Sequence, residues 1–84
     1  MTGEREIPLT RMQTGQSGMV IQIQGGIGLV NRLAAFNIRP GKKITKVSSM
    51  LMWGPVTIEV DRTQMAIGFG MANRVIVELN EAAK

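Results

Sequence analysis

The chain has 84 residues, of which 44% are hydrophobic, and a formal net charge of +4. The absence of cysteine and histidine excludes disulfides, thiolate metal sites and cysteine nucleophiles, and removes the commonest metal ligand and general base. We therefore expect one domain spanning residues 1–84 that is not an enzyme and needs no cofactor.

Residues 7–26 contain two predicted extended segments separated by a turn. The residue before Pro8 is biased away from helix, so Ile7–Thr10 should be extended. Residues 14–18 (TGQSG) are typical of a turn. In Met19–Gln24, successive side chains point to opposite faces, and the apolar residues of one face recur at every second position. We expect a half-buried strand here, with inward side chains Met19, Ile21 and Ile23.

Residues 28–36 are the segment with helical periodicity. Their apolar side chains form one stripe, made of Leu29, Val30, Leu33, Ala34 and Phe36. Asn37 adopts the left-handed conformation more readily than most residues, and Pro40 with Gly41 prevents continuation. The sequence predicts one α-helix over about residues 28–36 that ends at Asn37.

The second half of the chain reads as further strands. In 42–49 the alternation slips between Ile44 and Val47, and a bulge near Thr45 would place both inside. Residues 56–60, 64–69 and 74–79 alternate clearly, with a tight turn at 61–63 and one helical turn at 70–73. The expected inward side chains are Val56, Ile58, Val60, Met65, Ile67, Phe69, Val75, Val77 and Leu79.

This order of elements predicts a mostly β fold. About five or six short strands with tight turns and one inserted helix suit a small SH3-like antiparallel barrel. Closing the barrel would protect strand edges that so short a chain cannot otherwise cover.

Basic residues follow the predicted helix without any nearby acid. Between Glu6 and Glu59 there is no carboxylate, whereas Arg39, Lys42, Lys43 and Lys46 lie close together. These side chains could face anionic lipid headgroups or an acidic patch on a partner, or simply protect a strand edge in solvent. Nucleic acid binding is disfavoured because the chain has three aromatic rings, of which Phe36 and Phe69 are expected to be buried.

The stretch Met50, Leu51, Met52 and Trp53 places four large apolar side chains in succession. Adjacent strand residues point to opposite sides, so they cannot all face a thin interior. One interpretation is a hairpin folded back over an open barrel end. The other is a surface for docking or self-association, anchored by Trp53.

Metal and nucleotide signals are weak. Met50 and Met52 could share a strand face, but methionine is chiefly a core filler and thioethers favour copper(I) over iron(II). Glu59 and Asp61 share a face, yet two carboxylates without further ligands make a poor cation site. Gly25, Gly26 and Gly28 do not complete a nucleotide-binding fingerprint. We predict no metal site and no nucleotide site.

The order of these signals resembles the ferrous iron transport protein A (FeoA) family over residues 7–79, the expected core. The residues that carry the resemblance are Leu9, Gly15, Gly25, Gly26, Arg32, Leu33, Pro40, Gly41, Gly54, Pro55, Ile58, Val60, Ala66, Ile67, Ala72, Ile76 and Val77. Asn37 stands where the family usually has glycine, and Met50–Trp53 is bulkier than usual.

The resemblance implies a cytoplasmic accessory protein of bacterial ferrous iron uptake. It would act by contact with the cytosolic part of an FeoB-type membrane transporter and reach the inner membrane through that partner. The residue types themselves, not the resemblance, suggest the contact residues Met50, Leu51, Met52, Trp53, Lys42, Lys43 and Lys46. No secretory signal or run of about 20 apolar residues is visible. The alternatives are self-association through Met50–Trp53, or a metal-responsive or nucleic-acid-binding barrel similar to a domain of diphtheria toxin repressor-type regulators.

Overall fold

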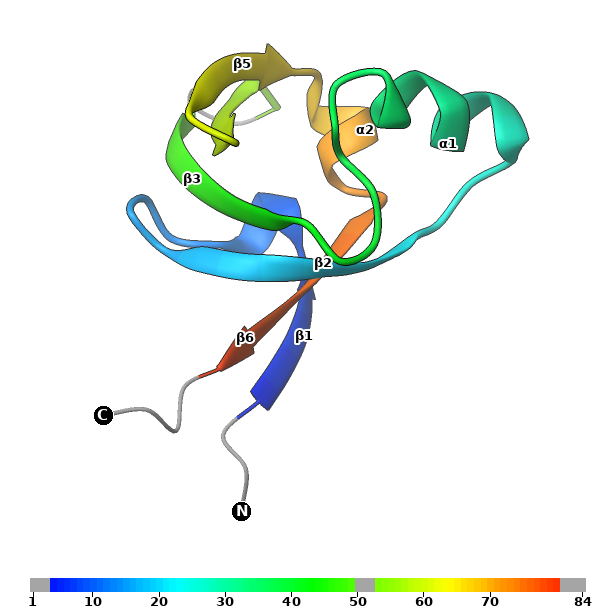
Figure 1. The fold of residues 1–84 in the computed structure, drawn as a ribbon. Helices are drawn as coiled ribbons and strands as arrows, with labels where there is room; N and C mark the ends of the chain where they lie inside the picture. The colour runs from blue at the N-terminus through cyan, green and yellow to red at the C-terminus, as the bar shows by residue number, and fades with distance from the viewer. Residues whose placement is uncertain (1–3, 50–52, 81–84) are drawn as a thin grey trace.

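The computed structural model describes residues 4–49 and 53–80. Six antiparallel strands form one strongly curled sheet, in the order β1-β6-β2-β3-β4-β5. The strands are β1 (Glu4–Pro8), β2 (Ser17–Ile23), β3 (Lys43–Ser49), β4 (Val56–Val60), β5 (Thr63–Ile67) and β6 (Val75–Asn80). The 3-10 helix η1 (Leu9–Arg11) follows β1, α1 (Ile27–Ala34) follows β2, and α2 (Phe69–Ala72) follows β5 (Figure 1).

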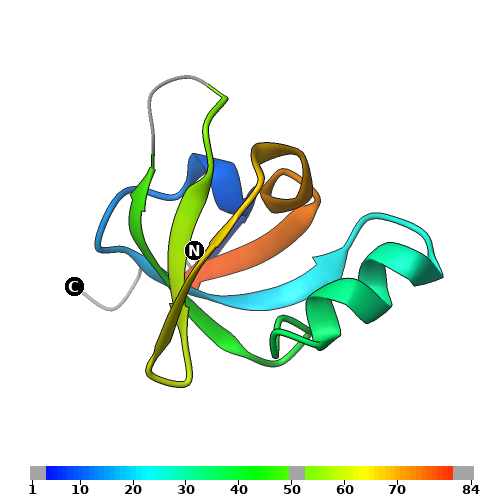
Figure 2. The ribbon, with the colours of Figure 1, turned by 90° about the horizontal axis from the view of Figure 1, so that it is seen from above.

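The barrel closes through its short helices rather than through a strand ladder. Within the described residues the strand pairings do not join β1 to β5, the two ends of the sheet. Instead η1 contacts α2, and the hydroxyl of Thr10 donates to Oδ1 of Asn73 at 2.9 Å. The sheet is thus rolled up, as Figure 2 shows, with its two edges capped by the helices that follow them.

One apolar core fills the rolled sheet and contains a side chain from every strand. Its buried members are Ile7, Leu9, Met12, Val20, Leu33, Ile38, Ile44, Val56, Ile58, Val60, Ile67, Ala72, Val75, Val77 and Leu79. The inward sets expected for β4 and β6 are therefore confirmed. In β5, Ile67 is buried, whereas Met65 is half-buried.

The chain turns out of the predicted helix at Asn37, as expected, but α1 itself ends at Ala34, two residues before the predicted end at Phe36. Asn37 has a φ of 65°, and its N–H donates to Ala34 while that of Ile38 donates to Leu33. This is a Schellman stop, in which buried Leu33 and Ile38 supply the usual apolar contact. Because α1 ends before Phe36, that ring lies in the turn and is 44% exposed, so the expectation that it is buried is wrong.

The facing of β2 differs from the simple alternation. Val20 is buried, whereas Met19 is 47% exposed, so the predicted inward set is wrong at its first member. The register against β6 shifts between Val20 and Gln22. This bulge inserts one residue, which returns Ile23 to the same side as Val20, where it packs against the core.

The bulge in β3 also lies further along the chain than predicted. The register against β4 shifts between Lys46 and Ser48, not near Thr45. Ile44 and Lys46 therefore point inward, while Val47 is only half-buried. The pattern could not indicate this because lysine is ordinarily an outward residue.

The hairpin between β4 and β5 is confirmed as a tight turn. Val60 pairs with Thr63, and the two residues between them, Asp61 and Arg62, have φ values of 52° and 69°. Left-handed conformations at both central positions define a type I′ turn, whose twist matches that of the strands. The usual Asn-Gly signal is absent, so this turn is formed by two residues with side chains.

Candidate partner-binding surface

Trp53 is the most exposed large hydrophobic side chain of the described residues. It precedes the Gly54–Pro55 break before β4, and 75% of its surface is accessible. Its ring meets the half-buried ring of Phe69 edge-on, with centroids 4.8 Å apart and planes at 83°. Such a contact stabilises an aromatic pair by about 0.5–1.5 kcal/mol. The indole is therefore positioned by Phe69 while most of it remains available.

The neighbouring predicted contact residues Met50, Leu51 and Met52 lie outside the described residues. Their proposed role, and the methionine metal hypothesis that rests on Met50 and Met52, stay predictions. Trp53 itself is 75% exposed, so its side chain does not fill the barrel interior.

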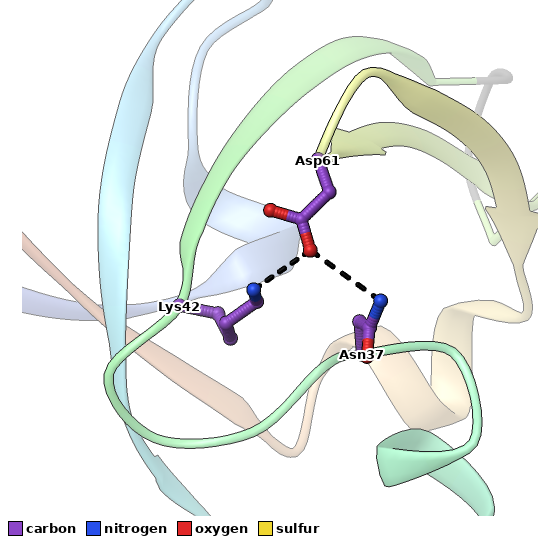
Figure 3. Close-up of polar contacts among 3 residues, drawn as sticks. All are labelled: Asn37, Lys42 and Asp61. Carbon is purple, nitrogen blue, oxygen red and sulfur yellow. Dashed lines mark hydrogen bonds and ion pairs between the residues drawn. The ribbon is translucent and has the colours of Figure 1, made fainter.

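Lys42 takes part in a local polar cluster that joins two loops. Its ammonium lies 2.7 Å from Oδ2 of Asp61, and the amide of Asn37 donates to the same oxygen at 3.4 Å (Figure 3). The cluster links the turn after α1 to the tip of the β4–β5 hairpin. Because both charged partners are partly exposed, the pair contributes at most about 1 kcal/mol. Lys42 is thus already paired with a carboxylate of its own chain.

Lys46 does not belong to a surface. It is 4% exposed, and its ammonium donates to the carbonyl oxygens of Thr10 at 3.1 Å and Met12 at 2.6 Å. Its backbone also exchanges hydrogen bonds with Gly15 and Gln16. Burial lowers the pKa of Lys46 below 10.5, because desolvation disfavours the charged form. Lys46 therefore anchors the chain after η1 to β3, and it cannot contact a partner as expected.

Lys43 and Arg39 remain as the exposed part of the basic run. Lys43 pairs with Met19 across the β2–β3 ladder, and Met19 pairs with Glu78 on the other side. The predicted basic run is therefore divided into an ion pair, a buried anchor and two exposed cations.

The described residues do not bring together three side chains of the kinds that commonly hold a metal ion. Asp61 is occupied by Lys42 and Asn37, so the pair with Glu59 considered from the sequence does not form an open carboxylate site. Neither is any helix of the described ranges long and apolar enough to span a bilayer.

Two residues that were not among the predicted contacts lie at or beside exposed positions. Phe69 was expected inside the barrel but supports Trp53 at the start of α2, and Ile27 at the start of α1 is 74% exposed. Each residue follows a glycine, Gly26 or Gly68, whose extended backbone caps the start of a helix. The strand alternation from which the inward side chains were predicted therefore ends at these glycines. That change of period was the available signal.

The fold is thus a small six-stranded antiparallel barrel of the SH3-like class, with an aromatic side chain displayed at one loop. Comparison with known proteins makes the assignment specific. The FeoA domain model matches residues 7–79, and the chain belongs to the FeoA family. The family resemblance inferred from the sequence is confirmed, and the protein is associated with ferrous iron transport.

Individual relatives agree with this assignment. The chain is 32% identical over 71 residues to "Putative Fe(2+) transport protein A" of Methanocaldococcus jannaschii, covering 84% of each protein. A crystal structure of an iron uptake regulatory protein (FeoA) superimposes with a TM-score of 0.81 at 37% identity, covering 89% of this chain and 99% of that one. T. acidophilum IdeR shares the fold, with a TM-score of 0.80 at 20% identity, over 89% of this chain and 34% of IdeR.

Proposed function

We propose that this chain is a non-enzymatic accessory protein of ferrous iron uptake that acts in the cytoplasm by direct contact with the cytosolic part of an FeoB-type iron transporter. Membership of the FeoA family supports the process. The observation that supports contact is Trp53, 75% exposed and positioned by Phe69. Tryptophan is among the residues most enriched at interface hot spots.

The contact would regulate the transporter by favouring one of its states. A binding protein shifts such an equilibrium only by its difference in affinity for the two states. The effect requires no reacting group on this chain, consistent with a sequence that has neither cysteine nor histidine. Any nucleotide chemistry would belong to the transporter.

Binding to the purified cytosolic domain of the transporter tests the proposal. Trp53→Ala should raise the dissociation constant about 30-fold, which corresponds to a loss of about 2 kcal/mol in binding free energy, as expected for an interface hot spot. Phe36→Ala is the matched control, because it removes an exposed ring elsewhere on the surface. Equal affinity of both variants and the parent would exclude Trp53 as the anchor, and no binding by the parent would reject the partner.

Two further assays separate the alternatives. Sedimentation at increasing protein concentration would detect self-association, which Trp53→Ala should abolish if that surface joins copies of the chain. Salt-sensitive retention on DNA or RNA would instead support a nucleic-acid-binding barrel.

A further inference from the structure

The two edge strands of the sheet differ in how their outer edges are protected. β1 carries charged residues and a proline, which discourage other strands from pairing with an edge: Glu4, Arg5, Glu6 and Pro8. β5, by contrast, reads TQMAI, and residues 63–73 contain no charged side chain. Its register against β4 also runs from Thr63 to Ile67 without a bulge. β5 therefore presents a regular, uncharged edge.

The turn before β5 determines which backbone groups point outward. In a two-residue hairpin the residues that close the turn, here Val60 and Thr63, exchange both hydrogen bonds, and bonded pairs recur at every second position. The N–H and C=O groups of Gln64 and Ala66 therefore point away from β4. Within the described part of the chain nothing bonds these outward groups, and both residues are exposed. Donors and acceptors are thus available along this edge.

The apolar core is open beside the same edge. Met65 faces inward with Ile67, yet it is half-buried, whereas its partner in β4, Ile58, is fully buried. Because β4 covers Met65 on one side, its accessible surface lies toward the free edge. Figure 2 shows α1 and the end of β2 on the side of β5 away from β4, and these contribute the partly buried side chains of Leu29 and Ile23. A segment that reached this edge would therefore also cover apolar surface.

The charge next to the edge is positive. Arg62 is exposed at the hairpin tip directly before β5, while its neighbour Asp61 is already paired with Lys42 at 2.7 Å. Glu59 pairs with Gln64 from β4, so the width of β5 separates it from the free edge. A segment lying along β5 would meet uncharged residues over most of its length and an arginine at its end beside the hairpin.

We propose that the edge of β5 binds an extended segment of a partner protein by strand addition, with an apolar side chain over Met65 and a carboxylate near Arg62. Hydrogen bonds to the backbone of Gln64 and Ala66 would supply affinity, and side chains at alternate positions would supply specificity. An antiparallel segment places one residue directly opposite Met65 on the inner face. A second copy of β5 would offer no carboxylate to Arg62. Trp53 has no part in this contact, which therefore does not depend on the proposed transporter contact.

A designed peptide tests the edge directly. The probe is acetyl-EVTVTVE-amide with its valine nitrogens methylated, so that the peptide can donate hydrogen bonds from its threonine edge alone. Added to the intact isotope-labelled chain, it should shift the amide signals of Gln64 and Ala66 and slow their hydrogen exchange, with a dissociation constant of about 0.1–1 mM. A matched peptide with the methyl groups on its threonines should bind at least about tenfold more weakly. Lysine in place of both glutamates should weaken binding about threefold, because Arg62 then meets a like charge.

Two variants of β5 complete the test. Ala66→Pro removes an outward N–H without removing a bond to β4, and should weaken binding of the probe at least about tenfold. Ala66→Ser keeps the backbone groups and should bind like the parent. Far-UV circular dichroism checks that both variants fold. If Ala66→Pro does not fold, the two methylated peptides still decide the question on the parent chain.

Several results would overturn the inference. These are failure of the probe to bind at about 5 mM, equal binding of the two methylated peptides, or signal changes confined to other elements. Signals of Gln64 and Ala66 that change with protein concentration alone would assign the edge to a second copy of the chain, and the partner segment would be wrong. None of these results bears on the transporter contact, because the assay contains no transporter.

Discussion

Replacing Lys46 with methionine tests whether a buried ammonium group holds the barrel together. Methionine keeps most of the aliphatic length but cannot donate to Thr10 and Met12, whose carbonyl oxygens accept bonds of 3.1 and 2.6 Å. A buried acceptor left without a donor costs about 1–3 kcal/mol. Part of this loss is offset because the charged group no longer has to be removed from water. We expect a net destabilisation of about 2–3 kcal/mol.

That loss is large relative to the whole domain. At about 0.05–0.15 kcal/mol per residue, a chain of 84 residues is stable by about 4–13 kcal/mol. With a urea dependence near 1 kcal/mol per molar for so small a domain, the unfolding midpoint should fall by about 2–3 M. Urea titration followed by far-UV circular dichroism measures this shift.

The matched control is Lys43→Met, in the same strand but on an exposed position. It removes the same charge and adds the same side chain, so its midpoint should change by no more than about 0.5 M. If Lys46→Met destabilises the protein no more than Lys43→Met, the two carbonyl contacts do not stabilise the fold and the reasoning fails.

Four further outcomes are expected. Because burial lowers the pKa of Lys46, the unfolded state binds more protons between that pKa and 10.5; the free energy of unfolding should rise with pH in this window in the parent but not in Lys46→Met, as urea midpoints at successive pH values will show. Arg62→Gly should raise stability by about 0.5–1 kcal/mol in thermal unfolding, since glycine removes left-handed strain from the hairpin, and a lower midpoint would contradict this. Asp61→Asn keeps a residue that tolerates positive φ but breaks the ion pair with Lys42, so it should cost less than about 1 kcal/mol, and high salt should shrink the difference from the parent. Leu33→Ala should cost about 2–4 kcal/mol and speed hydrogen exchange in α1 more than in β4; uniform acceleration would show that α1 is not separately fastened.

Residue types were sufficient to predict the exposure of Trp53 but not the different environments of the three lysines in the proposed contact surface. Four consecutive large apolar residues cannot all be buried in a thin sheet, and Trp53 is indeed exposed. Lys42, Lys43 and Lys46 look equivalent in the sequence, yet one pairs with Asp61, one faces solvent and one is buried. Their fates depend on acceptors contributed by distant segments, which no local pattern contains.

The sequence by itself determined the local features that depend on backbone preference and alternation. The inward side chains of β4 and β6 follow period-two patterns, and the helix stop at Asn37 follows from the ease with which asparagine adopts positive φ. Tertiary structure alone decided the bulge of β2, the position of the bulge in β3, the burial of Lys46 and the exposure of Phe36. A bulge changes facing by one residue to fit neighbouring strands, and a buried ammonium is tolerated only where carbonyl oxygens converge on it, so both depend on which segments meet in space.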